Sequence, residues 1–364
     1  MTHTLRVELG SRSYPISIGD RILQDIGKAL GPFKFGRSVA LVSNTTVFPL
    51  YGAAVSGSLS SSGFSCTEII LPDGEAFKTI ASAERIFEDL LKAGIDRKSA
   101  LVALGGGVVG DLAGFAASVY MRGIDFIQIP TTLLAQVDSS VGGKTGVNHP
   151  LGKNMIGTFW QPRLVWIDID TLATLPRREF VAGIAEIIKY GVIWDHELFA
   201  FLEAHARDVL GLERAALRHI IRRSCEIKAE VVARDEREGG LRAILNFGHT
   251  VGHAIETATG YTAFVHGEAV AVGMCVEAEI AHLLGLLTRE EADRTRRLIR
   301  TYGLPSSIPG NIDLHLFYDS MKLDKKAVSG ALRFILPERI GRVGIRDGVP
   351  ESLIARAVER AMEQ

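Results

Sequence analysis

Short apolar runs separated by amphipathic stretches make up roughly the first 170 residues. The runs are short enough to be strands buried in a sheet, and they cover residues 38–43, 66–71, 100–104, 125–130 and 164–168. Between two of them, Ile80, Ala83, Ile86 and Leu90 recur near helical spacing, which predicts a helix over 80–93. Strands that alternate with helices predict a mostly parallel α/β sheet.

The pattern changes to helical periodicity after about residue 175. The predicted helices cover residues 178–190, 197–206, 213–233, 241–257, 268–286 and 289–302. The tail returns to short strands at 332–336 and 343–345 and ends in a helix from about residue 350. We therefore expect two domains, an α/β domain over 1–172 and a mainly helical domain over 173–364. A cleft between two such domains is a common place for a ligand site.

Composition narrows the classes of protein. The 364 residues are 47% apolar and 23% charged, enough to bury a core, and the net charge of −1 argues against general nucleic-acid binding. The cysteines, Cys66, Cys225 and Cys275, form no C-x-x-C pair, which favours a reducing cytoplasm. The first residues lack the apolar core of a signal peptide, and no uninterrupted apolar run reaches about 18 residues. We expect a cytoplasmic protein without a membrane span.

A glycine-rich turn follows the predicted strand 100–104. Gly105, Gly107 and Gly110 satisfy G-x-G-x-x-G, and a helical pattern starts directly afterwards. Glycines let the backbone approach a pyrophosphate, and the amino terminus of a helix favours its negative charge. The sequence therefore predicts a nucleotide site here. The usual acidic residue about 20 positions further on is not clear, and Asn44, at the end of an earlier strand, is a candidate for the ribose contact.

A second polar tract runs from Pro130 to Thr145, with Lys153 and Asn154 just beyond it. Its Gly-Lys-Thr ending resembles a phosphate-binding loop only in part, because position 138 is Asp where that motif needs Gly. The alternative interpretation is a solvated loop. The density of Thr, Asp, Ser and Lys after a buried strand nevertheless indicates a lined pocket.

Three histidines indicate a metal site in the helical half. His249 and His253 are four residues apart, on one face of a predicted helix that also carries Asn246, and His266 follows 13 residues later. Because Thr250 follows His249, the general base of zinc peptidases is absent. A metal that acts as a Lewis acid on a carbonyl or alkoxide fits better. Taken alone, three ordinary core or surface histidines remain an alternative.

Charged residues on apolar helices also indicate a metal or ligand site. Glu186 and Lys189 lie three residues apart in a run that is otherwise apolar, and a buried acid is costly without a cation. Either an intrahelical ion pair or a metal would compensate it. Lys228 and Arg242 flank a charged run, 235–238, that is broken by two glycines before the histidine segment.

Together these motifs resemble the 3-dehydroquinate synthase family, a member of the sugar phosphate cyclases. The segments that carry the resemblance extend from Pro72-Asp-Gly-Glu75 to Lys325-Lys326 and include 105–115, 120–123, 130–145 and 235–253. The resemblance implies an NAD-binding, Rossmann-like α/β domain and a helical domain that binds zinc, with cobalt as the other candidate metal. It also implies a homodimer, in which Arg122 reaches the neighbouring subunit's site.

The resemblance implies roles for individual residues. The implied metal ligands are Glu186, His249 and His266, and the implied catalytic residues are Lys189, His253, Lys144 and Asn246. The implied NAD-binding residues are Asn44, Asp73, Glu75, Lys78, Gly105, Gly106, Gly107, Val108, Val109, Asp111, Thr131, Thr132, Asp138, Ser139, Lys144 and Lys153. The implied substrate-binding residues are Arg122, Asp138, Lys144, Asn154, Lys189, Lys228, Arg242, Asn246, His253 and Lys326, with Lys325 as an alternative to the last. Some family members have Asp in place of Asn44, which keeps a hydrogen-bonding group but not its charge.

The substrate implied by the family is 3-deoxy-D-arabino-heptulosonate 7-phosphate, a small anionic sugar acid. The implied reaction oxidises it transiently with NAD, eliminates phosphate, returns the hydride and closes the ring by an intramolecular aldol step. The clustered Lys and Arg residues agree with such a substrate. Three alternatives remain open at this point: a sister cyclase acting on sedoheptulose 7-phosphate, a metal-dependent polyol dehydrogenase, and a non-catalytic NAD-binding regulator.

Overall fold

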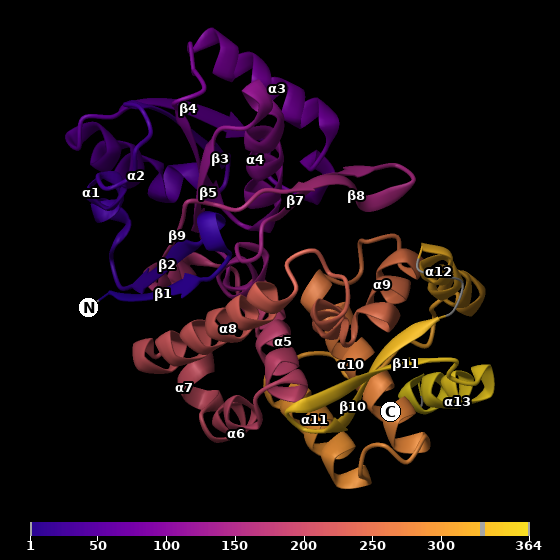
Figure 1. Ribbon diagram of the computed structural model, residues 1–364. Helices are drawn as coiled ribbons and strands as arrows, with labels where there is room; N and C mark the ends of the chain where they lie inside the picture. Colours follow the sequence, from indigo (N-terminus) through magenta and orange to yellow (C-terminus); the bar gives the residue numbers. More distant parts are fainter. Residues whose placement is uncertain (1, 328–331, 363–364) are drawn as a thin grey trace. The chain divides into compact units, whose positions relative to one another are not determined.

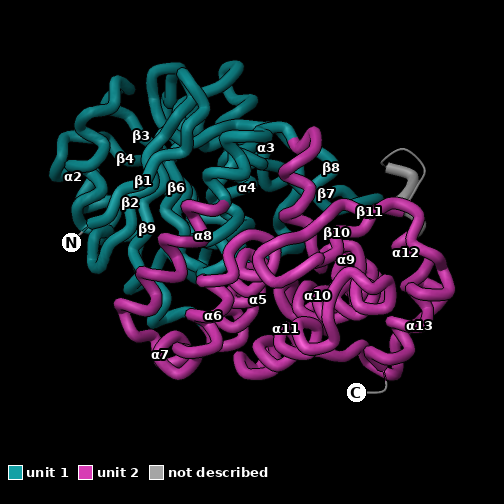
Figure 2. The backbone as a smooth tube through the Cα atoms, turned by 60° about the horizontal axis from the view of Figure 1, so that its bottom comes forward, with its two compact units in different colours: residues 1–175, 228–237 teal, residues 176–227, 238–364 magenta. Residues whose placement is uncertain are grey.

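The computed structural model describes residues 2–327 and 332–362, and of residues 322–327 it describes the backbone only (Figure 1). The chain divides into two compact units (Figure 2). Unit 1 comprises residues 1–175 and 228–237, and unit 2 comprises residues 176–227 and 238–364. The predicted boundary, after residue 172, lies three residues before the observed one, and the return of 228–237 to unit 1 was not predicted.

Unit 1 is built on a seven-stranded sheet with the order β1-β2-β9-β6-β5-β3-β4. Only β1 and β2 pair antiparallel, so the prediction of a mostly parallel, Rossmann-like sheet is confirmed. The strands are β1 (His3–Val7), β2 (Tyr14–Gly19), β3 (Ser38–Asn44), β4 (Ser65–Leu71), β5 (Ala100–Gly105), β6 (Asp125–Pro130) and β9 (Leu164–Asp168). The register pairs Asn44 with Leu71 and Gly105 with Pro130, so the segments that follow these strands share one edge of the sheet.

Helices cover both faces of this sheet, because alternate strand residues pack to opposite sides. Ala40 and Val42 pack with residues of α3 (Ile80–Lys92) and α4 (Gly107–Val119). Val39 and Leu41 pack with residues of α1 (Ile26–Leu30) and α2 (Phe48–Ser61). The continuously apolar strand pattern thus reflects burial on both faces.

The polar tract after β6 is not an irregular loop. It forms a π-helical turn, η5 (Ala135–Ser139), and an antiparallel hairpin of β7 (Lys144–His149) and β8 (Gly152–Phe159). The sequence did not predict this hairpin, because polar and glycine residues interrupt the alternation that marks a strand. Its apolar side chains include Leu151 and Met155, which are 92% and 74% exposed.

Unit 2 is mainly helical, as predicted. Its helices are α5 (Arg177–Ile193), α6 (His196–Ala204), α7 (Ala206–Leu210), α8 (Arg214–Arg234), α9 (His249–Ala258), α10 (His266–Leu283), α11 (Arg289–Thr301), α12 (Leu314–Ala327) and α13 (Glu351–Met362). The last turns of α8, from Lys228, are counted with unit 1. A hairpin of β10 (Arg333–Arg339) and β11 (Arg342–Asp347) completes the unit. Helix α10 is buried along most of its length and packs against α5, α9, α11 and α13.

The predicted single helix over 241–257 is wrong. Residues Leu241–Asn246 form a 3-10 helix, η7, and the chain breaks before α9 starts at His249. Gly248 has φ +81, and a Cβ there would lie 2.6 Å from Met274 Cγ and 2.8 Å from Val270 O. The close approach to α10 therefore requires glycine, and its left-handed conformation ends the helical path. Asn246 consequently does not share a helix with His249 and His253.

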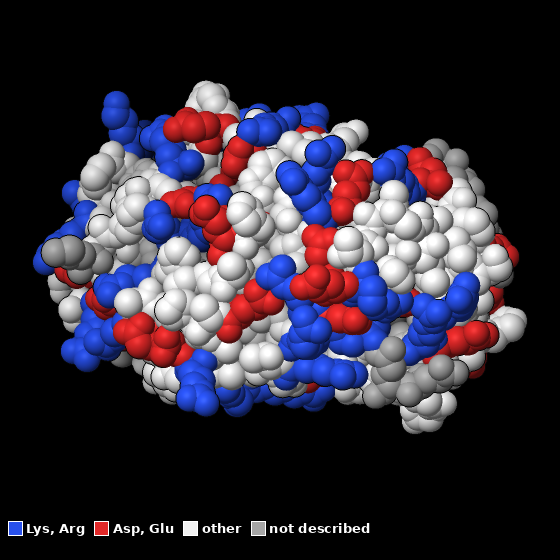
Figure 3. Space-filling view, turned by 90° about the horizontal axis from the view of Figure 1, so that it is seen from below, with Lys and Arg blue, Asp and Glu red and all other residues white. Residues whose placement is uncertain are grey.

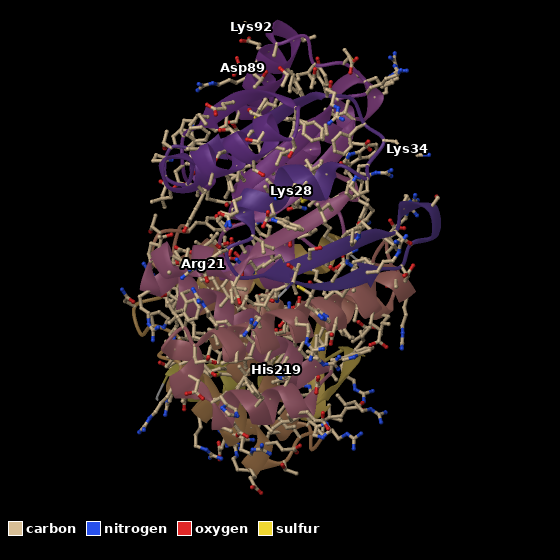
Figure 4. All side chains as sticks on the ribbon, turned by 90° about the vertical axis from the view of Figure 1, so that its left-hand side faces the viewer. Arg21, Lys28, Lys34, Asp89, Lys92 and His219 are labelled. Atoms are coloured by element: carbon tan, nitrogen blue, oxygen red, sulfur yellow. The ribbon has the colours of Figure 1, made fainter. Side chains whose placement is uncertain are left out.

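The described surface is mixed in charge. One face of the molecule shows basic and acidic side chains interspersed, in keeping with a net charge of −1 (Figure 3). Lys28, Lys34 and Lys92 are exposed on the outer surface of unit 1 (Figure 4). Among the described helices, none combines the length and apolar character needed to cross a membrane.

Candidate metal and nucleotide sites

Glu186, His249 and His266 converge in unit 2. The Nε2 atoms of His249 and His266 lie 3.6 and 3.7 Å from the same oxygen, Glu186 Oε1. Tetrahedral zinc ligands at 2.0–2.2 Å from the ion are roughly 3.4 Å from one another. The spacing of these three ligand atoms therefore suits one divalent ion, and they are the set that the family resemblance implied.

Helix packing places the three groups. Glu186 lies in the middle of α5, whereas His249 and His266 are the first residues of α9 and α10. A Cβ on Gly267 would lie 1.9 Å from the carbonyl oxygen of Ala182, one turn before Glu186, so glycine allows α10 to start directly against α5. The start of α9 is held by the buried Glu277, whose Oε2 accepts from the Gly248 N–H at 2.8 Å. Burial raises the pKa of Glu277 to about 8, although that N–H opposes the shift.

The two imidazoles have different electrostatic surroundings. Burial, with Lys189 and the neighbouring histidines, holds the pKa of His249 well below its usual value, so this ring is neutral and ready to ligate. Its Nδ1 lies 3.1 Å from the carbonyl oxygen of Phe247, which leaves Nε2 toward Glu186. Burial acts to lower the pKa of His266 too, but the carboxylates of Glu256 and Glu186 outweigh it and raise the pKa.

The carboxylate of Glu186 fits a metal ligand. It is fully buried, and its Oε2 forms an ion pair with Lys189 Nζ on the same helix. Within the described residues, Oε1 accepts no hydrogen bond. A buried carboxylate oxygen in this position is costly unless a cation compensates it. The intrahelical ion pair and the metal are thus not mutually exclusive, because Oε2 can pair with Lys189 while Oε1 binds the ion.

The remaining predicted groups of unit 2 are His253, Asn246, Arg242 and Lys326. The ring of His253 is exposed and lies 5.5 Å from that of His249 and 6.2 Å from that of His266, between centroids. Asn246 Nδ2 donates to Glu238 Oε1 at 3.2 Å. Arg242, in η7, is only 2% exposed. The side chain of Lys326 lies outside the described residues.

The glycine turn of unit 1 has the predicted context, since it joins β5 to α4. Helix α4 begins at Gly107, and the N–H groups of a first helical turn have no partner within the helix. A Cβ on Gly106 would lie 2.9 Å from Thr132 Cγ2, and one on Gly107 would lie 3.0 Å from Ser139 Oγ. The structure therefore brings the second polar tract, with Thr131, against the glycine turn.

Lys78 connects several predicted cofactor and substrate groups. It is 4% exposed, and its Nζ lies 2.5 Å from Asp111 Oδ2 and 2.6 Å from Asn154 Oδ1. Burial raises the pKa of Asp111, and the charge of Lys78 opposes that shift. Asn148 extends the network, because its Nδ2 donates to Glu75 Oε1 at 2.7 Å and its Oδ1 accepts from the Asn154 N–H.

Asn44 and Asp73 meet at the ends of β3 and β4. Asn44 Nδ2 donates to Asp73 Oδ1 at 2.6 Å, and Thr46 Oγ1 donates to Asp73 Oδ2 at 2.7 Å. Asn44 Oδ1 accepts from the N–H groups of Thr46 and Val47. The carboxylate that Asn44 lacks is thus supplied beside it by Asp73.

Asp138 is paired with Lys228, which the sequence assigned to the helical domain. Lys228 Nζ lies 2.8 Å from Asp138 Oδ1 and 2.7 Å from its carbonyl oxygen, and both residues belong to unit 1. Lys144 is exposed at the start of β7, and Lys153 is half-buried in β8. Arg122 follows α4, next to Met121, and both have positive φ, +67 and +48.

Both halves of the chain match family descriptions. Residues 68–182 match "3-dehydroquinate synthase N-terminal", and residues 183–327 match "3-dehydroquinate synthase C-terminal". A 3-dehydroquinate synthase of Thermodesulfovibrio yellowstonii is 55% identical over 341 residues, covering 94% of this chain and 95% of the relative. The chain belongs to the 3-dehydroquinate synthase family.

Two solved structures resemble this member of the 3-dehydroquinate synthase family. One is 2-epi-5-epi-valiolone synthase of Streptomyces hygroscopicus with NAD⁺ and Zn²⁺, at 29% identity and a TM-score of 0.89 over 97% of each chain. The other is 2-deoxy-scyllo-inosose synthase with carbaglucose-6-phosphate, NAD⁺ and Co²⁺. It has 27% identity and a TM-score of 0.90 over 99% of this chain and all of that one.

Two carboxylates near the site were not singled out from the sequence. Glu238 contacts Asn246, and Glu256 lies beside His266. Glu256 follows His253 by three residues on a helix, a spacing that places both side chains on one face and was available in the sequence. Glu238 stood within a charged run, where nothing distinguished it from a solvated residue.

Proposed function

We propose that this chain is a 3-dehydroquinate synthase that converts 3-deoxy-D-arabino-heptulosonate 7-phosphate to 3-dehydroquinate and phosphate. The observation that carries the proposal is the convergence of Glu186, His249 and His266, with Lys189 against the same carboxylate, in a chain of this family. Zinc or cobalt at these ligands would polarise a substrate oxygen, and NAD would accept and return the hydride. The enzyme is a carbon–oxygen lyase of aromatic amino acid biosynthesis.

The nucleotide would bind at the carboxyl edge of the sheet in unit 1. The first turn of α4 would hold the pyrophosphate, and Asp73, fixed by Asn44 and Thr46, would face the ribose. Glu75, Lys78 and Asp111 form a connected network that orders the surrounding polar groups. Asp138, held by Lys228, and Ser139 would complete the site from η5.

The protein's own groups would bind the anions and move protons. Lys189 is buried beside Glu186, where it can hold a proton close to a substrate hydroxyl bound at the ligands. His253 is exposed next to both ligand imidazoles, where it can bind phosphate or transfer a proton. We assign the phosphate to Lys144, Asn154, Asn246 and Arg122, and the carboxylate to Lys228, Arg242 and Lys326.

The decisive experiment supplies the purified chain with Zn²⁺ or Co²⁺, catalytic NAD and the heptulosonate phosphate. We expect release of phosphate together with 3-dehydroquinate and no net change in absorbance at 340 nm. A polyol dehydrogenase would accumulate NADH, a sister cyclase would prefer sedoheptulose 7-phosphate, and a regulator would turn over neither sugar. Each of those three results would contradict the proposal.

We further propose a homodimer in the cytoplasm. Val119 and Met121, which are 43% and 39% exposed, lie just before Arg122 in the chain, and none of the three cysteines forms a disulfide. An apolar patch beside an exposed arginine is a suitable contact for a second copy. Mixing inactive Arg122→Ala with inactive His249→Ala subunits should restore part of the activity. No recovery, despite demonstrated subunit exchange, would argue against a shared site.

A further inference from the structure

Glu256 is a buried carboxylate beside a proposed metal ligand, and the proposed reaction gives it no role. It lies near the end of α9 and is 4% exposed. Its Oε1 is 3.6 Å from Nδ1 of His266, whose Nε2 lies 3.7 Å from Glu186 Oε1. The imidazole of His266 therefore stands between two carboxylates, with one nitrogen toward each.

His249 shows the same arrangement with a different outer group. Its Nε2 faces Glu186, and its Nδ1 faces the carbonyl oxygen of Phe247 at 3.1 Å. In metal sites, the second nitrogen of a ligating imidazole almost always donates to a carboxylate or carbonyl, which fixes the tautomer and the ring orientation. Within unit 2, each proposed histidine ligand thus has an oxygen on its outer side.

We propose that Glu256 is a positioning residue for the metal site: it accepts the Nδ1 proton of His266 and keeps the Nε2 lone pair directed at the ion. The inference rests on the proposed metal ligands and assigns a residue that acts through one of them. At 3.6 Å the contact is an ion-pair distance rather than a hydrogen bond, so the ring has room to settle closer when Nε2 is engaged.

The placement of Glu256 suits this role. It lies seven residues, or about two turns, beyond His249 on the same ten-residue helix, so α9 supplies one ligand and the outer partner of the other. His266 is the first residue of α10 and is 33% exposed, so its ring has no preceding helical turn to hold it. A buried carboxylate from the adjacent helix supplies that restraint.

A competing arrangement makes Glu256 a ligand itself. His253, Glu256 and His266 also bring ligand atoms within 4.8 Å of one another. In that case Glu256 would contact the ion directly, and Glu186 would not. The two arrangements predict different losses when Glu256 is replaced.

The test measures binding of Co²⁺ to the full chain after chelator treatment. The variants are Glu256→Ala, Glu256→Gln, His249→Ala and, as the matched control, Glu279→Gln. Glu279 is another buried carboxylate of unit 2, and its partners are Arg289 and Arg360 rather than a proposed ligand. Affinity comes from competition with a chromophoric chelator, the ligand field from the visible absorption of bound Co²⁺, and folding from thermal unfolding of the metal-free chains.

We expect Glu256→Ala to bind one Co²⁺ per chain about 10- to 100-fold more weakly, with an altered visible spectrum. Glu256→Gln, which keeps an acceptor oxygen, should lie between Ala and wild type, and Glu279→Gln should bind as wild type does. Unchanged affinity and spectrum in Glu256→Ala would overturn the proposal. Two other results would also overturn it: Co²⁺ binding by Glu256→Gln that is no tighter than by Glu256→Ala, or a loss of Co²⁺ binding in Glu256→Ala as complete as in His249→Ala. Wild-type binding by His249→Ala would instead refute the metal ligands themselves.

Discussion

In unit 1 two buried lysines of the candidate nucleotide site are each paired with a carboxylate, whereas in unit 2 one carboxylate oxygen of the candidate metal site faces two imidazoles. Lys78 pairs with Asp111 and Lys228 with Asp138, each at hydrogen-bond distance. Glu186 Oε1 has the Nε2 atoms of His249 and His266 at 3.6 and 3.7 Å. Each lysine of unit 1 thus has a protein carboxylate as its partner, whereas the spacing around Glu186 Oε1 suits a bound cation. We therefore expect replacements of the ligands in unit 2 to change metal binding and replacements of the lysines in unit 1 to change the free energy of unfolding.

The largest effect should come from His249→Ala. Loss of one of three ligands should abolish stoichiometric metal binding and bring turnover below detection, because a catalytic ion needs its protein ligands before it can bind substrate oxygens. Metal content after dialysis and phosphate release measure both. The control is His219→Ala on α8 (Figure 4). Its ring packs at a tilt against Phe201, with 4.1 Å between the centroids, and it is not a member of the metal cluster. Full metal content in His249→Ala would contradict the assignment of His249 as a ligand and, with it, the proposed difference between the two units.

Replacing Lys78 should test the buried ion pair of unit 1. Lys78→Met leaves Asp111 without its closest cation, and breaking a buried pair from one side costs about 3 kcal/mol. Urea unfolding should show this loss while metal content stays unchanged. Lys92→Met is the matched control, since Lys92 pairs with Glu88 at 3.5 Å on the exposed surface and should change stability by less than about 0.5 kcal/mol. Equal effects of the two variants would contradict the buried role of Lys78.

His253→Ala should separate catalysis from metal binding within unit 2. The ring is exposed next to both ligand imidazoles, so we expect the variant to keep its metal and NAD while turnover falls roughly 10²-fold, the scale of a lost acid–base group. Steady-state rates, with metal analysis of the same preparation, measure this. Loss of the metal would instead make His253 a ligand.

The smallest effect concerns Glu279 of unit 2. Like Asp111 and Asp138 of unit 1, this carboxylate is paired with basic side chains of the protein. Against the effect of burial, hydrogen bonds from Arg289 and Arg360 lower its pKa to about 2. A lowered pKa stabilises the fold above the ordinary carboxyl pKa of 4.5, and this stabilisation is lost as the pH falls toward 2. Glu279→Gln should therefore lower the free energy of unfolding by about 1–2 kcal/mol at pH 7, a value reduced for the solvent screening of its half-exposed arginines. At pH 4 the loss should be smaller, because part of the stabilisation is already absent in the wild type. A difference that does not change with pH would show that the charge is not responsible.

The sequence predicted those features that depend on local pattern. Strands β6 and β9 have the predicted bounds, because burial on both faces gives an uninterrupted apolar run. The convergence of Glu186, His249 and His266 was expected from residue type, spacing and family resemblance. The break at Gly248 was not, since it depends on how closely α9 approaches Met274, which is remote in sequence.

Long-range pairing also escaped prediction. Lys78 meets Asp111 and Asn154, which are 33 and 76 residues away, and no periodicity links these positions. Lys228 appeared to belong with the helices that surround it in sequence, yet it contacts Asp138 from a segment that returns to unit 1. Ion pairs of this kind are set by the completed fold, so a single sequence does not reveal the partners.

The return of residues 228–237 to unit 1 limits how the protein can be divided. A fragment that ends at residue 175 would contain the whole seven-stranded sheet but not Lys228, the partner of Asp138. Unit 1, with the candidate nucleotide site, is therefore not encoded by one continuous stretch of the gene. Recombination between relatives at residue 175 would bring Asp138 and Lys228 into one chain from different parents.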